Sequence, residues 1–167
     1  MAVEKMLLDA ARLNLRIRRE YARIKRDPAA RYYTYVLLLQ RGKLYCGSSD
    51  NIFMRLLDHT LGTPSAALWV KEHGPIERVV EITRNCSRED EHYKTLEYMS
   101  LFGWENVRGA GWCKLDMHRP PSALDTFARD PQRQMEYMAR RDVDAVWAQV
   151  QGMARELTAP GDAANGL

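Results

Sequence analysis

Four side chains suited to chemistry on a phosphate follow one another in this sequence. Tyr35 and Tyr45 lie in two alternating apolar segments, and Arg55 and His59 occupy positions i and i+4 of the periodic run that follows. A tyrosine acts as a general base when a nearby cation lowers its pKa, and the arginine fork matches phosphate oxygens. Because i and i+4 share one helical face, Arg55 and His59 are predicted to point toward the same region.

Each of these residues also has a plain structural explanation. A tyrosine in a strand is most often a packing residue, and an arginine and a histidine one turn apart are most often part of a solvated helix face. The ordered combination of all four residues favours a functional site over these explanations.

The predicted elements place the two tyrosines on paired strands. Alternating apolar residues on both sides of a turn at Arg41-Gly42 indicate a β-hairpin whose strands end near Leu39 and Gly47. A helix is expected to begin at Ser49 or Asp50, both good N-cap residues. We therefore expect the two tyrosine hydroxyls to converge near one end of the hairpin.

Further segments complete a small domain. We predict a short helix over residues 66–70, a third strand over 76–83, a longer helix from Ser87 to about Leu101, and a glycine-bearing turn over 106–112. The predicted fold class is α/β of the α+β type, with a small three-stranded antiparallel sheet flanked by helices within residues 30–115.

Helical segments are predicted on both sides of this domain. Residues 1–29 contain a basic amphipathic helix, and residues 116–159 form a C-terminal helical extension whose last helix begins at Asp130-Pro131. This last helix carries a stripe of methionine, valine and tryptophan that is typical of a packing face. The terminal helices offer more apolar surface than so small a core needs, which favours a homodimer. The composition of residues 160–167 predicts a disordered tail.

Composition limits the class of protein. The chain of 167 residues is 46% hydrophobic and 28% charged, as expected of a globular protein. No apolar run reaches the length of about 18 residues that a membrane span needs. The N-terminus lacks the pattern of a signal peptide, so we expect a cytoplasmic protein that is not secreted. Three cysteines without CxxC spacing argue against a disulfide framework and a cysteine-rich zinc site.

Basic residues are clustered although the net charge is only +3. The second half of the N-terminal helix is rich in arginine, and clustered cations supply the sequence-independent part of nucleic-acid binding. A solvated helix face would have the same composition, so both explanations stay open. The residues that we assign to nucleic-acid contact are Arg16, Arg19, Arg23, Lys71 and Arg108.

The ordered residues resemble the motif of the GIY-YIG nuclease family. Tyr33-Thr34-Tyr35 stands at the place of the first signature triplet and Tyr45-Cys46-Gly47 at the place of the second, with Arg55 and His59 following in the family's order. The first triplet matches only in its last tyrosine, and the second matches in its tyrosine and glycine. The resemblance covers about residues 32–113.

By this resemblance, a glutamate on a later helix would bind a divalent metal ion, Mg²⁺ or Mn²⁺, and Asn106 would help to hold the site. Glu91 and Glu97 both stand at suitable places. We prefer Glu91, in the first turns of its helix, because the helix dipole disfavours a carboxylate near the C-terminal end, to which Glu97 is closer.

The resemblance implies a metal-dependent DNA endonuclease that hydrolyses phosphodiester bonds with one metal ion, in a homing-type, restriction, repair or mobile-element role. Tyr35 or Tyr45 would act as the base, Arg55 would stabilise the developing charge, and His59 would orient a tyrosine or take part in proton transfer. The alternative is a non-catalytic nucleic-acid-binding or scaffold module on the same fold. Such a module would have little reason to keep these residues together.

Overall fold

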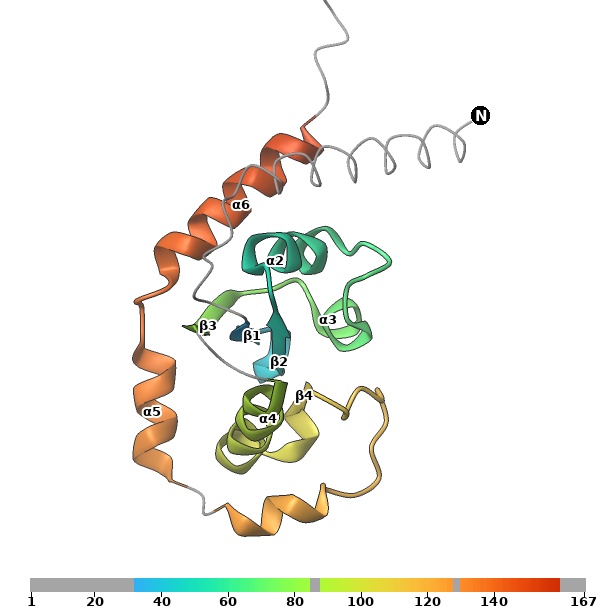
Figure 1. The fold of residues 1–167 in the computed structure, drawn as a ribbon, viewed down its shortest axis with the longest axis vertical. Coiled ribbons are helices and arrows are strands. Elements are labelled where there is room, and N and C mark those ends of the chain that lie inside the picture. The colour runs from blue at the N-terminus through green and yellow to red at the C-terminus, as the bar shows by residue number, and fades with distance from the viewer. Residues whose placement is uncertain (1–31, 85–87, 128–129, 160–167) are drawn as a thin grey trace, which may run out of the picture.

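The computed structural model describes residues 32–84, 88–127 and 130–159 (Figure 1). The predicted basic helix with its three assigned arginines, the predicted N-cap at Ser87 and the predicted tail lie outside these ranges. Among the described helices, none combines the length and the apolar character that crossing a membrane requires. With η for 3-10 helices, the elements are β1 (Tyr33–Leu38), η1 (Gln40–Gly42), β2 (Leu44–Ser49), α2 (Ile52–Leu61), α3 (Leu68–His73), β3 (Arg78–Arg84), α4 (Arg88–Phe102), η2 (Trp104–Asn106), β4 (Val107–Gly109), η3 (Ser122–Thr126), α5 (Pro131–Ala139) and α6 (Asp144–Thr158).

The sheet has four strands in the order β3-β1-β2-β4, one strand more than predicted. β1 pairs antiparallel with β2, as predicted, and with β3, whereas β4 pairs in parallel with Leu44–Cys46 of β2. The prediction missed β4 because its three residues are too few for an alternating pattern and lie in the segment that we predicted as a turn. The fold is therefore mixed α/β with a mixed sheet.

The connection between β1 and β2 is a tight turn at the predicted residues. Arg41 and Gly42 have φ angles of 57° and 71°. Positive φ at both central residues is typical of the type I′ turn, whose twist matches that of antiparallel strands. The resulting register sets Tyr35 opposite Gly47.

Helix α2 begins at Ile52, slightly later than predicted, because strand β2 extends to Ser49. The Ser49 hydroxyl accepts a hydrogen bond from the backbone N–H of Asn51 at 3.0 Å and donates to the carbonyl of the same residue at 2.9 Å. Ser49 thus closes the turn between strand and helix, and Asn51 takes the N-cap position.

Alternate residues of the central strands face two separate cores, as a period of two requires. Tyr35 and Leu37 of β1 pack with α2, α3 and α6, whereas Val36 of β1 and Cys46 of β2 pack with α4. The sheet is therefore the middle layer, with α2 and α3 on one face and α4 on the other (Figure 1).

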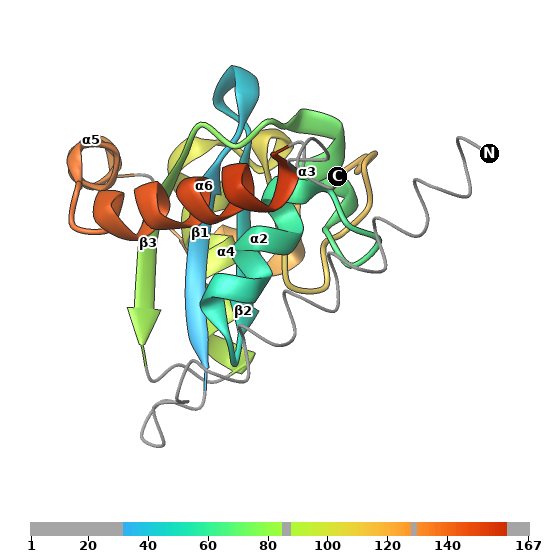
Figure 2. The same ribbon diagram turned by 90° about the horizontal axis from the view of Figure 1, so that it is seen from above.

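The predicted C-terminal extension packs on both sides of the sheet. Tyr137 of α5 joins the core under α4, whereas Val143, Trp147 and Val150 join the core under α2. Figure 2 shows α6 crossing the strands, with α5 beyond β3. The predicted packing face of the last helix is therefore confirmed for α6, whereas Met135 of α5, which the prediction placed on the same face, is 72% exposed. Because this face is buried within the chain, surplus apolar surface on α6 no longer argues for a homodimer.

The single helix predicted from Asp130 is two helices in the structure. Asp130 is the N-cap of α5, and its side chain accepts hydrogen bonds from two backbone N–H groups of the first turn. The helix ends at Ala139 with Arg140 as its C-cap, and the guanidinium of Arg78 donates to the carbonyls of Met138 and Arg140. These side-chain contacts replace the backbone hydrogen bonds that would have continued the helix.

Candidate active site

The two tyrosines of the motif lie side by side on one face of the hairpin. The ring centroids of Tyr35 and Tyr45 are 6.3 Å apart, and 0% and 8% of their surfaces are exposed. The hydroxyl of Tyr35 lies over Gly47, since a Cβ atom added at Gly47 would stand 2.3 Å from the hydroxyl oxygen. β4 pairs with β2 only as far as Cys46. The Tyr35 hydroxyl therefore lies at the end of β2 that β4 leaves uncovered.

Helix α2 brings Arg55 and His59 to these tyrosines, in agreement with their i, i+4 spacing. The ring of His59 lies 5.7 Å from that of Tyr35 and 5.3 Å from that of Tyr45. The guanidinium of Arg55 donates to the carbonyl of Ser65, in the loop after α2, and lies close enough for its charge to lower the pKa of both tyrosines. A phosphate that reaches this guanidinium would thus lie beside both hydroxyls.

His59 is buried and fixes the oxygen of Tyr35. Its Nε2 lies 2.7 Å from the Tyr35 hydroxyl, and the backbone N–H of Ala67 donates to its Nδ1 at 3.4 Å. Burial, reinforced by the charge of Arg55, lowers the pKa of His59 to about 3, so the imidazole is neutral at pH 7. Because Nδ1 accepts, the single proton of the neutral ring is on Nε2. His59 therefore donates to Tyr35.

The two tyrosine hydroxyls are both protonated at neutral pH. Burial and the neighbouring Tyr45 raise the pKa of Tyr35 well above its ordinary value, and the charge of Arg55 opposes this rise. Burial raises the pKa of Tyr45 to about 12, and Arg55 again opposes it. Tyr45 retains a small exposed area, whereas Tyr35 has none, so Tyr45 is the more accessible of the two tyrosines.

Glu91 reaches the same end of β2 from helix α4. Its Oε2 accepts a hydrogen bond from the hydroxyl of Ser48 at 2.5 Å, and its Oε1 accepts from the backbone N–H of Ala110 at 3.2 Å. Each oxygen keeps a lone pair for a cation. Besides burial, the charge of Glu91 contributes to the raised pKa of both Tyr35 and Tyr45. The carboxylate thus lies close enough to act on both hydroxyls.

The backbone and a buried hydroxyl near Glu91 are both unusual. Ala110 has a φ of 50°, in the left-handed region, and is held there by paired backbone hydrogen bonds of 3.1 and 2.9 Å between Gly109 and Trp112. Thr34, which faces Ser48 across the strands, is buried and its Oγ1 has no partner among the described residues. Both features cost free energy; the first is at a residue that donates to Glu91, and the second is at the residue opposite Ser48.

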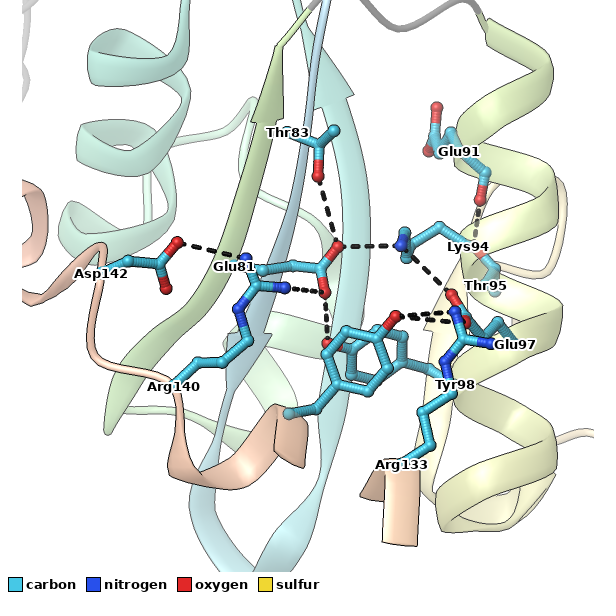
Figure 3. A network of polar contacts seen from close by, with 11 residues as sticks. Glu81, Thr83, Glu91, Lys94, Thr95, Glu97, Tyr98, Arg133, Arg140 and Asp142 are labelled. Atoms are coloured by element: carbon cyan, nitrogen blue, oxygen red, sulfur yellow. Dashed lines mark hydrogen bonds and ion pairs between the residues drawn. The ribbon is translucent and has the colours of Figure 1, made fainter. Parts of the chain in front are cut away.

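Glu97, the second choice for the metal-binding glutamate, lies in a different network (Figure 3). Only 4% of its surface is exposed, and its carboxylate pairs with Lys94 at 3.1 Å and with Arg133. The hydroxyl of Tyr137 donates to the same carboxylate at 3.1 Å. The structure thus brings Glu91, and not Glu97, to the tyrosines.

Asn106, which we assigned to the site, lies at the other end of α4. Its Oδ1 accepts from the ammonium of Lys43 at 2.9 Å, and its Nδ2 donates to the carbonyl of Phe102 at 2.9 Å. Helix α4 has 15 residues, so its ends lie about 20 Å apart at the usual rise of 1.5 Å per residue. Asn106 therefore ties the end of α4 to the hairpin and does not stand beside Glu91.

Cys113 belongs to the surroundings of the site although the sequence did not indicate it. Its thiol is exposed and donates to the carbonyl of Ala110 at 3.0 Å. Burial of the sulfur and the charge of Glu91 raise the pKa of Cys113, and its own charge acts on Tyr45. The turn that holds Ala110 brings the cysteine here; a turn over residues 106–112 was predicted, but sequence spacing does not show that it lies beside Glu91.

The two described residues assigned to nucleic-acid contact differ in exposure. Lys71 is exposed on α3, as a phosphate contact requires. Arg108 is 3% exposed, and its guanidinium donates to four backbone carbonyls of residues 104–115 and stacks on Trp69 at 4.3 Å. The assignment of Arg108 is therefore wrong, because this guanidinium is already used to hold the loop after β4.

The donors around Glu91 can be compared with those that different metal ions take in proteins. Among the described residues, no three His, Cys, Asp or Glu side chains are grouped as a metal site requires. Zinc needs such a group. Mg²⁺ keeps several waters and takes one or two carboxylates together with substrate phosphates. Glu91, with both oxygens oriented by Ser48 and Ala110, fits the second pattern.

Comparisons of this chain with models of protein families, with curated proteins and with solved structures found no match.

Proposed function

We propose that this protein is a divalent-metal-dependent DNA endonuclease that hydrolyses phosphodiester bonds by chemistry of the GIY-YIG type. The observation that carries the proposal is the meeting of two groups at the uncovered end of β2. One group is the pair of tyrosines with Arg55 and His59, and the other is Glu91 from a helix on the opposite face of the sheet. Packing alone does not require these residue types to converge.

The residues divide the work of in-line hydrolysis among themselves. The guanidinium of Arg55 holds the scissile phosphate and stabilises the charge that develops on its oxygens. Tyr45, the more exposed tyrosine, takes the proton of the attacking water once the arginine and a bound cation favour its ionised form. His59 donates to Tyr35 and so fixes the ring against which Tyr45 packs.

Glu91 is the group that would hold the metal ion. A Mg²⁺ or Mn²⁺ ion bound there would stabilise negative charge on the phosphate and on the leaving oxygen. Ser48 and Ala110 contribute by orienting the carboxylate before the ion arrives.

A nicking assay on supercoiled plasmid tests the proposal. The wild-type protein is expected to nick the plasmid with Mg²⁺ or Mn²⁺ and to be inactive with EDTA. Arg55→Gln and Glu91→Gln should each lower the rate by about 100-fold or more, as loss of one group that stabilises transition-state charge does. Glu89→Gln is the matched control, because Glu89 is an exposed carboxylate on the same helix.

Two outcomes would contradict the proposal. Cleavage that survives both Arg55→Gln and Glu91→Gln would show that these residues do not form the active site. If the protein binds DNA but cleaves it with none of the divalent metal ions tested, the result would favour a non-catalytic nucleic-acid-binding module.

A further inference from the structure

A second buried polar cluster lies between α4 and β3, away from Tyr35 and Tyr45 (Figure 3). The carboxylate of Glu81, on β3, is 1% exposed, accepts from the hydroxyl of Tyr98 at 2.8 Å and pairs with Lys94 at 3.0 Å. Lys94 also pairs with Glu97. Burial opposes the charge on Lys94, but the two carboxylates raise its pKa. One ammonium thus links two buried carboxylates.

Helix α5 and its C-cap supply the remaining charges of this cluster. Arg133 pairs with Glu97, and Arg140 lies 3.7 Å from Glu81. The only buried side chain of α5 is that of Tyr137, and Met135 is 72% exposed. Helix α5 is therefore held on α4 and β3 mainly by ionic contacts and hydrogen bonds.

Helix α6 is held differently and reaches the other face of the sheet. Its buried residues Trp147, Val150 and Ala154 are apolar and join the core that contains Tyr35. Trp147 also lines a cavity of about 210 Å³ that is lined by His59 as well. Helix α6 thus packs against α2 and shares a cavity with the histidine that holds the Tyr35 hydroxyl.

We propose that residues 131–158 form a strap that keeps the two halves of the site in register, with Arg133 and Arg140 as positioning residues that latch it. This inference rests on the proposed nuclease function for its kinetic consequence. Its α5 end holds the helix that carries Glu91, and its α6 end holds the helix that carries Arg55 and His59. These helices lie on opposite faces of the sheet (Figure 1), so a strap around the β3 edge restrains both.

The latch can be tested selectively, because its arginines are half exposed while its carboxylates are buried. The latch variant is Arg133→Gln/Arg140→Gln. In this variant Lys94 still neutralises part of the buried charge, so the chain is expected to fold. The matched control is Arg119→Gln/Arg155→Gln, which removes the same charge from two exposed arginines that form no ion pair within the described ranges. Arg133→Lys/Arg140→Lys keeps the charge without the fork.

Hydrogen exchange and the pKa of His59, followed by NMR, report on the strap without requiring activity. In the latch variant, amides of α5, α6 and α2 are expected to exchange about ten times faster or more, as local opening predicts. Water entering behind His59 should raise the pKa of His59 from about 3 toward 6.5. The groups around His59 are the same in every variant. They are Arg55, whose charge lowers this pKa, and the two tyrosines that adjoin the ring, Tyr35 and Tyr45.

The kinetic result should separate positioning from general loss of structure. The latch variant is expected to lower kcat by about tenfold with KM nearly unchanged, as small displacements of catalytic groups do. The lysine variant should recover part of kcat, and the control should match the wild type. Faster exchange confined to α5, with α2, His59 and kcat as in the control, would overturn the strap. If the wild type cleaves no nucleic acid, the nuclease proposal fails, and exchange in α2 still decides the strap.

Discussion

The hydroxyl of Tyr35 lies so close to Gly47 on the neighbouring strand that a side chain at position 47 has no space. A Cβ atom added at Gly47 would stand 2.3 Å from the hydroxyl oxygen of Tyr35 and 2.5 Å from its Cζ atom. Both distances are well inside van der Waals contact. Since His59 donates to the same hydroxyl at 2.7 Å, the ring cannot move away without breaking this hydrogen bond. Gly47 therefore determines where the first tyrosine places its oxygen.

Gly47→Ala is expected to destabilise the fold by about 1–3 kcal/mol, as overpacking of a core does, and to lower the nicking rate strongly because the Tyr35 hydroxyl is displaced. Gly111→Ala is the control, since a Cβ atom there meets nothing within 4 Å. Urea unfolding and the plasmid assay measure the two effects. Wild-type stability and activity in Gly47→Ala would show that the close approach is unimportant.

Ser48→Ala is expected to weaken Mn²⁺ binding, because Ser48 donates to the Glu91 carboxylate. Loss of such a supporting hydrogen bond typically lowers metal affinity by about 10–100-fold, and Ser48→Thr should retain most of the affinity. Titration calorimetry with Mn²⁺ gives the constants. Ser100→Ala on α4 removes a hydroxyl that bonds only to the helix backbone, and it should bind as the wild type. Equal affinities for Ser48→Ala and Ser100→Ala would contradict this account.

The stability of the fold should fall with acidification because of His59. Its pKa is 6.5 when unfolded and about 3 when folded, so the unfolded state binds a proton in this window that the folded state does not. The contribution is complete above pH 6.5 and is lost at about 1.4 kcal/mol per pH unit as the pH falls toward 3. Urea unfolding at several pH values from 7 to 4 gives the free energy of unfolding. This free energy should fall less steeply with decreasing pH in His59→Gln than in the control His118→Gln. Equal slopes would mean that His59 titrates normally.

A bulky maleimide on Cys113 is expected to block cleavage, because this exposed thiol adjoins Glu91 and Tyr45. Cys46 is buried, and burial raises the pKa of its thiol, so it should react far more slowly. The experiment uses a Cys86→Ser background, and Cys113→Ser in that background is the control that should stay active after treatment. Cleavage at the untreated rate by fully labelled protein would place Cys113 away from the substrate.

Sequence periodicity was sufficient for the hairpin half of the candidate site. Alternation in two strands and the i, i+4 spacing of Arg55 and His59 depend only on local geometry, and the structure brings these residues to Tyr35 and Tyr45. The choice of Glu91 over Glu97 followed from the helix dipole. The reason found in the structure is different, since Glu97 is taken up by Lys94 and Arg133.

The remaining errors come from contacts between distant segments. β4 exists because three residues pair with β2, which no alternating pattern can reveal. Arg108 has the sequence context of a surface cation, but the carbonyls of residues 104–115 surround its guanidinium. Asn106 follows α4 as the family pattern suggests, yet the length of that helix separates it from Glu91. Local spacing contains none of this information.

The central claim is that Glu91 holds a divalent metal ion beside the two tyrosines. Anomalous diffraction from crystals soaked in Mn²⁺ tests it most directly. The account predicts a peak within about 2.5 Å of a Glu91 carboxylate oxygen, the range of metal–oxygen bonds, and no peak in crystals of Glu91→Gln. A peak at Glu97, or none at Glu91 in a protein that cleaves DNA with Mn²⁺, would contradict it.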